Sequence, residues 1–124
     1  MNQDSRRTEA NHAALRRVLA SFCERANAEK TVRKMFRDWK RNIHLQMTDT
    51  PDTWTVQVAD LSAGFREEPV EPRHMLITST EEILVAIFTG KANPAAEYAA
   101  GRVKFNGSAK DEMKLDAIID LIWR

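Results

Sequence analysis

The sequence has little of what stabilises secreted domains or anchors a protein in a membrane. Its 124 residues include a single cysteine, Cys23, so an internal disulfide is excluded and a reducing compartment is expected. No apolar run approaches the roughly 20 residues that a membrane-spanning helix needs. The first residues, MNQDSRRTEANH, lack the apolar centre of a secretory signal, and the peroxisomal ending Ser-Lys-Leu is missing. We therefore expect a cytoplasmic protein.

Motifs that carry catalysis are also missing. The sequence contains no Gly-x-Ser-x-Gly element, no glycine loop that holds phosphate and no paired metal-ligand spacing. Cys23 is interpreted as a small apolar residue on a helix stripe. His12, His44 and His74 fall on separate elements; the last two could meet on neighbouring strands, but histidines that complete packing or face solvent are commoner than a metal pair. We expect no catalytic residue, metal or cofactor, and keep a small enzyme as a third alternative.

Charge is distributed unevenly along the chain, although the net charge is only +1. Residues 1–41 carry eleven Lys or Arg against five acids, whereas residues 42–124 carry eight against thirteen. The basic segment lacks interleaved exposed aromatics, so nucleic-acid binding is not expected. Arg33, Lys34 and Arg37 predict a docking face for an anionic membrane surface or a protein partner. The simpler alternative is a helix face that only keeps the protein solvated.

The length fits one domain, residues 1–124, with helices over residues 1–39 and a sheet with covering helices over residues 40–124. Apolar residues at helical spacing predict a first helix of about four turns. The phase fails at Glu29 and Lys30, and a second apolar stripe follows, so we expect a kink or a new helix capped by Asn27 or Thr31. The two stripes consist of Leu15, Val18, Leu19, Phe22, Cys23 and Ala26, then Val32, Met35, Phe36 and Trp39.

Five strands are predicted after these helices. Apolar and polar residues alternate over residues 43–47 and 54–58, on either side of an Asp49-Thr50-Pro51-Asp52 turn. Further strands are expected at 62–67, 75–78 and 102–106, with a loop over residues 67–72 and a final helix over residues 111–123. The predicted fold class is α/β (α+β), a five-stranded, mainly antiparallel sheet with helices on one face.

Residues 77–107, ITSTEEILVAIFTGKANPAAEYAAGRVKFNG, contain several element boundaries in close succession. Ser79 and Glu82 have the spacing of a capping box, which predicts a helix from about residue 80. This helix is apolar on nearly every side, as is typical of a helix buried between two surfaces, and it ends at Gly90. Asn93-Pro94 then predicts a second, short helix, which Gly101 ends. Val103 and Phe105 alternate with polar residues, as in a half-buried strand.

This order of elements resembles the core of the sterol carrier protein lipid-binding domain family. The family pattern is a strand, a helix ending in glycine, an Asn-Pro pair opening a short helix, a Gly-basic-hydrophobic-basic strand and a closing glycine. The matching positions here are 75–78, 80–90, Asn93-Pro94, 101–105 and Gly107. The resemblance implies a sterol-carrier-like fold with an added N-terminal helical segment. It also implies a hydrophobic tunnel between sheet and helices that encloses a fatty acid, a sterol-like molecule or an isoprenoid lipid.

The expected function is therefore binding, and possible intracellular transfer, of an apolar ligand. The alternative is a non-catalytic accessory subunit that presents lipophilic intermediates to biosynthetic enzymes, as some bacterial relatives in ubiquinone synthesis are thought to do. Tyr98 is expected to contact a lipid head group through its hydroxyl. The other expected lining residues are apolar, although each could instead belong to the core; they are Leu84, Ile87, Phe88, Phe105, Ile118, Ile122 and Trp123.

Overall fold

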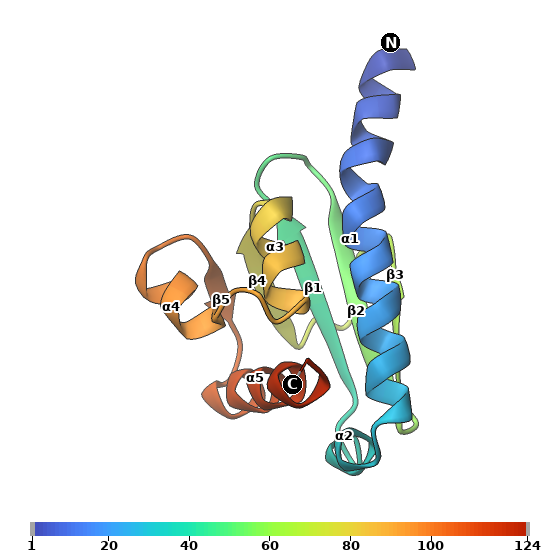
Figure 1. Ribbon diagram of the computed structural model, residues 1–124, viewed down its shortest axis with the longest axis vertical. Helices are drawn as coiled ribbons and strands as arrows, with labels where there is room; N and C mark the ends of the chain where they lie inside the picture. The colour runs from blue at the N-terminus through green and yellow to red at the C-terminus, as the bar shows by residue number, and fades with distance from the viewer. Residues whose placement is uncertain (1, 124) are drawn as a thin grey trace.

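Two consecutive helices begin the fold, as the two apolar stripes predict. The computed structural model describes the backbone of residues 2–123 and the side chains of residues 12–123. Helix α1, Asn2–Ala28, continues for 27 residues because no glycine or proline interrupts the stretch. Helix α2, Lys30–Met35, follows and turns the chain toward the sheet (Figure 1).

The junction between α1 and α2 differs from the prediction. Neither Asn27 nor Thr31 caps α2. The N-cap is Glu29, whose carboxylate accepts a hydrogen bond from the backbone N–H of Thr31 at 3.1 Å. The Asn27 side chain instead bonds both the backbone N–H and the C=O of Ala63, at 2.7 and 2.9 Å. A tertiary contact therefore decides the role of Asn27, which local capping preference does not anticipate.

Five strands form one mixed sheet, which confirms the α+β class. The strands are β1 (Arg41–Met47), β2 (Thr53–Ala59), β3 (Ser62–Arg66), β4 (Met75–Ser79) and β5 (Lys104–Asn106). Their order is β3-β2-β1-β4-β5. Only the central β1–β4 pair is parallel, and the other three pairs are antiparallel, so the sheet is mainly antiparallel as predicted.

The three remaining helices are α3 (Glu81–Phe88), α4 (Pro94–Ala99) and α5 (Ala109–Ile122). The predicted cap of α4 is confirmed, since the Asn93 side chain accepts from the Ala96 N–H at 3.1 Å and Pro94 occupies the first turn. Helix α5 begins two residues before its predicted start, because Ser108 caps it by accepting from the Asp111 N–H at 3.0 Å.

The predicted Ser79–Glu82 capping box is wrong by one residue. The N-cap of α3 is Thr80, whose hydroxyl accepts from the Ile83 N–H at 3.3 Å. Ser79 is buried as the last residue of β4, and its hydroxyl donates to the Arg102 C=O at 2.6 Å. Ser79 also pairs with Met47 of the parallel strand β1, so strand pairing holds it in the sheet and leaves Thr80 to begin the helix.

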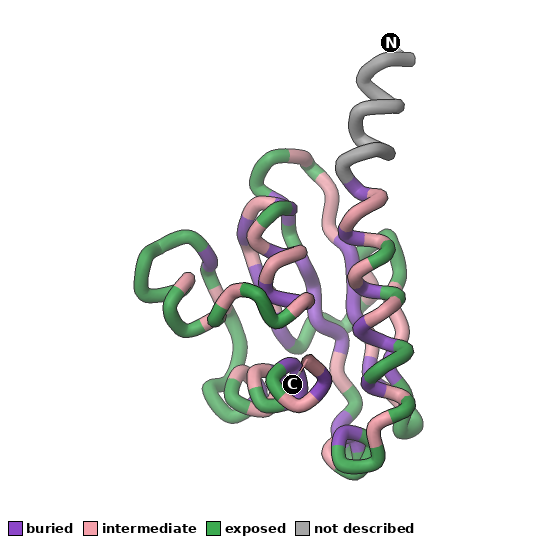
Figure 2. The backbone as a smooth tube through the Cα atoms, viewed as in Figure 1, coloured by how far each residue is buried: buried purple, intermediate pink, exposed green. Residues whose placement is uncertain are grey.

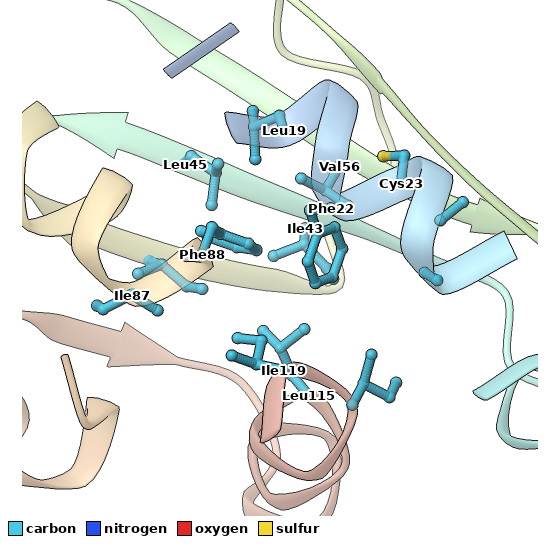
Figure 3. Packing of buried hydrophobic residues seen from close by; sticks show 14 of the residues in the cluster. Leu19, Phe22, Cys23, Ile43, Leu45, Val56, Ile87, Phe88, Leu115 and Ile119 are labelled. Atoms are coloured by element: carbon cyan, nitrogen blue, oxygen red, sulfur yellow. The ribbon is translucent and has the colours of Figure 1, made fainter. Parts of the chain in front are cut away.

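Helices α1, α3 and α5 pack on one face of the sheet and enclose the core (Figure 1). Figure 3 shows Phe22 of α1, Phe88 of α3 and Leu115 of α5 directed toward the strand residues Ile43 and Val56. The Phe22 and Phe88 rings meet edge to face, with centroids 5.1 Å apart. The alternation predicted for β1 and β2 is therefore confirmed, because their apolar residues point to this face.

The second face of the sheet is covered by the loop of residues 67–74 instead of a helix. His44 and Thr55 on this face are buried and bond the loop backbone, His44 to the Val70 C=O at 2.8 Å and Thr55 to the Glu68 C=O at 2.8 Å. The predicted loop is thus confirmed, and it satisfies the buried polar groups of this sheet face.

Candidate functional site

An apolar cavity lies where α3, α4 and α5 meet the β4–β5 edge of the sheet. We call it the interhelical cavity. Its main lining side chains are Ile77, Ile87, Val103, Phe105, Leu115 and Ile119. Helix α4 contributes Pro94 and Tyr98. The volume is about 30 Å³, which has room for about two water molecules.

Helix α4 covers this cavity without belonging to the core. It has no buried residue, and Tyr98 is 56% exposed. Figure 2 shows the segment around α4 as mostly exposed or intermediate, in contrast to α3. Gly90 and Gly101 flank the segment with positive φ angles of 73° and 78°, a conformation that glycine adopts without strain. The covering helix is therefore bounded by two conformationally permissive residues.

The cavity shares its walls with two hollows on the surface. Pro94, Asp116 and Ile119 also line a hollow of about 530 Å³ near the N-terminal end of α4. Tyr98 and Phe105 also line a hollow of about 340 Å³ near its C-terminal end. Only a few side chains therefore separate the interior from solvent on two sides of α4.

Two carboxylates of α5, Glu112 and Asp116, complete the cavity lining. They are one helical turn apart, so both lie on the same face of the helix. Burial raises the pKa of Asp116, and the negative charge of Glu112 raises it further. The otherwise apolar cavity thus has an acidic side.

The structure brings together only some of the eight predicted lining residues. Ile87, Tyr98 and Phe105 line the interhelical cavity. The other four aliphatic or phenyl side chains lie in the core and outside the cavity lining; they are Leu84, Phe88, Ile118 and Ile122.

Trp123 lies apart from the cavity, at the end of α5. Its side chain packs beside Gly90, and the Arg25 guanidinium lies 4.2 Å from the centre of its ring. The indole N–H is buried and has no hydrogen-bond partner within the part of the chain that the structure describes. Its contacts join the C-terminal ends of α3 and α5.

Sequence reasoning missed all four residues that α5 contributes to the cavity lining. The residues concerned are Glu112, Leu115, Asp116 and Ile119. The lining residues expected from this helix, Ile118, Ile122 and Trp123, lie outside the cavity lining. One sequence signal was available for this set. Glu112 and Asp116, and likewise Leu115 and Ile119, are four positions apart, a spacing that places each pair on one side of a helix.

A polar cluster around His12 was also missed. His12 is 5% exposed and lies between Glu81 at the start of α3 and Asp52 before β2, with each ring nitrogen 2.7 Å from a carboxylate oxygen. Burial alone would lower the pKa of His12, but the hydrogen bonds and charges of Asp52 and Glu81 raise it above 6.5. Burial in turn raises the pKa of Glu81, although His12 opposes this. These partners lie 40 and 69 positions away, so no local pattern connects them.

The remaining reactive side chains have structural partners. His44 bonds the loop backbone, and His74 Nδ1 accepts from the Asn42 N–H at 2.8 Å. The two histidines are on or next to the neighbouring strands β1 and β4, but the described side chains include no cluster able to hold a metal ion. Burial raises the pKa of Cys23 to about 12, which makes its thiol a poor nucleophile.

The basic residues expected to dock, Arg33, Lys34 and Arg37, are all exposed on or just after α2. A surface hollow of about 550 Å³ lies beside them, lined by Phe36, Arg37, Asp38, Trp39, Lys40, Arg41, Asp60 and Leu61. Across residues 2–123, no helix combines the length and apolar character that a bilayer-spanning segment requires.

Comparison with solved structures places this arrangement in a known fold. A sterol carrier protein domain of Helicoverpa armigera matches with a TM-score of 0.71 and 14% identity, covering 89% of this chain and 88% of that chain. A ubiquinone synthesis protein, UbiJ-SCP2, matches with a TM-score of 0.67 and 10% identity, over 85% of this chain and 95% of that chain. At these identities the likeness concerns the fold alone.

The same fold also matches part of a larger chain. The sec-alkylsulfatase Pisa1 from Pseudomonas sp. matches with a TM-score of 0.59 and 16% identity, over 72% of this chain but only 14% of that chain. A comparison with curated protein sequences gave no match. The sequence profile of the SCP-2 sterol transfer family matches residues 19–120, most of the chain. The chain belongs to the SCP-2 sterol transfer family.

Proposed function

We propose that this protein is a non-catalytic carrier that binds an apolar ligand in the interhelical cavity. The observation that supports it is an apolar cavity between α3, α5 and the sheet edge, covered by a helix with no buried residue. Moving an apolar ligand from water into such a cavity is favourable by about 25 cal/mol per Å² of apolar surface removed from water. The lone, buried Cys23 is compatible with a reducing cytoplasm as the place of action.

The ligand must enlarge the cavity to enter it. Pockets for drug-sized ligands have volumes of about 300 to 1,000 Å³, whereas the interhelical cavity has about 30 Å³. Displacement of α4 would join the cavity to the two adjoining hollows, because they already share wall residues. We therefore expect α4 to move outward when a fatty acyl, sterol-like or isoprenoid ligand binds.

Helix α4 is a better candidate for this movement than α5. Asp111 at the start of α5 accepts hydrogen bonds from Trp39 Nε1 and Arg41 Nε, both at 2.8 Å. At the other end of α5, Trp123 packs against Gly90. Helix α4 has only six residues, and such a short helix is unstable without tertiary contacts. Movement of α4 therefore disturbs fewer buried contacts.

The test is to identify a bound lipid and then to fill the cavity. Native mass spectrometry, followed by organic extraction, should detect an apolar small molecule that co-purifies or that is taken up from mixed fatty acids and phospholipids. Ile87→Trp places a larger side chain into the cavity wall and should abolish uptake while the circular dichroism spectrum is retained.

Val85→Trp is the matched control. Val85 is half-buried on the same helix but does not line the cavity, so this variant should bind ligand as the wild type does. Uptake by a folded Ile87→Trp variant would place the binding site elsewhere. Failure of the wild type to take up any lipid would refute the carrier function.

The alternative function is an accessory subunit that presents lipophilic intermediates to biosynthetic enzymes. The fold likeness to a ubiquinone synthesis protein and the exposed basic face of α2 favour it. Co-precipitation should then recover enzymes that act on lipophilic substrates. Reversing the charges of Arg33, Lys34 and Arg37 should release them, and equal recovery by the reversed variant would contradict docking through this face.

A further inference from the structure

We propose that the interhelical cavity selects apolar ligands with an uncharged, hydrogen-bonding head group and rejects those with a carboxylate. This inference rests on the proposed carrier function and narrows its ligand class. The two acidic side chains in the cavity lining carry the argument. A free fatty acid would be the disfavoured ligand, and a long-chain alcohol or a sterol-like alcohol would be the favoured one.

Within residues 12–123, the charged residues that line the cavity are both acidic. They are Glu112 and Asp116, one turn apart on α5. Neither forms an ion pair or a hydrogen bond with another side chain of residues 12–123. Their negative charge is therefore not neutralised locally, and it acts in a site with apolar walls, where repulsion between like charges is stronger than in water.

The nearby cations do not line the cavity. Lys91 lines the outer hollow at the N-terminal end of α4, together with Asp116 and Asp120. Lys104 lines the other outer hollow. Arg102 forms a bidentate hydrogen bond with the Glu97 carboxylate. A carboxylate head group that lies beside α5 would thus face two acids, and Lys91 and Lys104 would flank only the parts of the site that the outer hollows add.

A hydroxyl head group fits the same surroundings. It can donate a hydrogen bond to Glu112 or Asp116 and can accept one from the Tyr98 hydroxyl, whereas an ionised carboxylate can only accept. The net charge of the whole protein is +1, so its total charge does not repel anions. The selection would be local to the cavity.

The experiment compares two ligands with the same twelve-carbon tail, dodecanol and dodecanoate. Each displaces the uncharged fluorescent probe N-phenyl-1-naphthylamine from the purified full-length protein at pH 8. Dodecanol should bind about tenfold more tightly than dodecanoate, a difference of one decade in Kd. In the Glu112→Gln, Asp116→Asn double variant, dodecanoate should bind nearly tenfold more tightly than it binds the wild type. The affinity for dodecanol should stay within about threefold of the wild-type value.

The matched control is the Glu24→Gln, Glu82→Gln double variant, which removes two exposed charges outside the cavity lining and should keep the wild-type preference. Lowering the pH to 5 should reduce the preference, because dodecanoate and Asp116, whose pKa is raised by burial and by Glu112, take up protons. Glu112, Asp120 and Lys91 are the other charged groups around Asp116.

Three results would overturn the inference. Equal binding of the two ligands at pH 8 would show that the acids do not select. Tighter dodecanoate binding that Lys104→Ala removes would place the head group in the outer hollow instead. A wild type that binds neither ligand, nor any lipid from a mixed extract, would refute the carrier function itself and this inference with it.

Discussion

His12 is the residue whose role depends most on its surroundings. It is a histidine on the first helix, yet it joins that helix to two distant segments through Glu81 and Asp52. Its ring also lies edge to face with Trp54, with centroids 5.4 Å apart. The protonated ring can donate from both nitrogens at once, which matches the two carboxylate acceptors. The two carboxylates therefore favour the protonated form of His12 and raise its pKa above 6.5, against the opposing effect of burial.

The first prediction is that stability falls as His12 loses its proton. Because its pKa is raised on folding, its contribution is fully present below about pH 6.5 and is lost as the pH rises through the higher folded-state value. The raised pKa of Glu81 acts in the same direction but at lower pH, above its ordinary value of 4.5. His12→Gln should lower the free energy of unfolding by about 2 kcal/mol at pH 6 and remove the decline above neutrality.

Urea unfolding at pH 6 and pH 8.5, followed by tryptophan fluorescence, measures both effects. Glu67→Gln is the control, because it breaks the exposed Arg16–Glu67 contact of the same helix and should change stability by less than about 1 kcal/mol. Equal stability of the wild type at the two pH values would show that folding does not raise the pKa of His12.

Gly90 carries the second prediction. An added Cβ at this position would lie 2.7 Å from the Cβ of Trp123, and the φ angle of 73° already disfavours a side chain. Gly90→Ala should therefore lower the unfolding free energy by roughly 3 kcal/mol, combining backbone strain with displaced packing. Urea unfolding followed by circular dichroism would measure this loss.

Gly101→Ala separates the two causes. Gly101 has a similar φ angle of 78°, but no atom lies within 4 Å of an added Cβ. Its substitution should lower stability by only about 1 kcal/mol, from the backbone alone. If both variants lost the same amount, the contact between Gly90 and Trp123 would contribute nothing to the packing of α5.

Among the elements, α1 protects the exposed edge of the sheet. Strand β3 is the first strand in the sheet order, so one side of its backbone lacks a neighbouring strand. Asn27 of α1 bonds both the N–H and the C=O of Ala63 on this strand, in the way that a partner strand would. This contact satisfies backbone groups that would otherwise be free to pair with another chain.

The third prediction concerns this contact. Asn27→Ala should lower the unfolding free energy by about 2 kcal/mol, because it removes two hydrogen bonds from a partly buried site. Hydrogen exchange should become faster at Ala63 and remain unchanged in the β1–β4 pair. Asn106→Ala is a suitable control, since Asn106 is an exposed side chain on the opposite edge strand. Unchanged exchange at Ala63 would mean that the Asn27 bonds do not protect the edge.

Across the whole molecule, positive and negative charges are unevenly distributed along the chain, although the net charge is only +1. The basic first third forms α1 and α2, and its exposed residues around α2 lie next to the hollow that contains Leu61, which is 42% exposed. Basic residues beside an exposed apolar group are typical of surfaces that meet anionic membranes. A carrier needs such a surface where it loads and unloads its ligand.

The fourth prediction is that the protein binds vesicles containing phosphatidylserine. Each basic residue near such a surface contributes about 1 kcal/mol, so reversing Arg33, Lys34 and Arg37 to Glu should weaken binding by about 100-fold or more. Added salt should weaken wild-type binding in the same direction. Vesicle co-sedimentation measures both effects.

The control for this test reverses three basic residues elsewhere, with the same total change in charge. The exposed residues Arg66, Arg73 and Lys110 are suitable. This variant should lose much less affinity than the α2 variant. Equal loss of affinity in the two variants would indicate that net charge alone attracts the protein to the vesicles. If the wild type does not bind anionic vesicles, the basic residues around α2 form only a solvated surface.

The sequence by itself determined the elements and the family pattern. Apolar periodicity set the helices and the strands, and the Asn93-Pro94 start of α4 was predictable because a cap acts within one turn of the helix. Where a prediction failed, a distant partner had replaced the local one. Ser79 is held by strand pairing and by Arg102, and Asn27 by Ala63.

Only the tertiary structure decided which apolar residues line a cavity and which lie in the core. Ile119 and Ile118 are neighbours on α5 with the same side chain, yet only Ile119 reaches the cavity, because the direction of α5 against β5 and α4 sets what each faces. The acidic side of the cavity and the His12 cluster arose in the same way. Each site combines residues from separate elements. Sequence periodicity predicts which face of an element is apolar, but it does not predict which other element packs on that face.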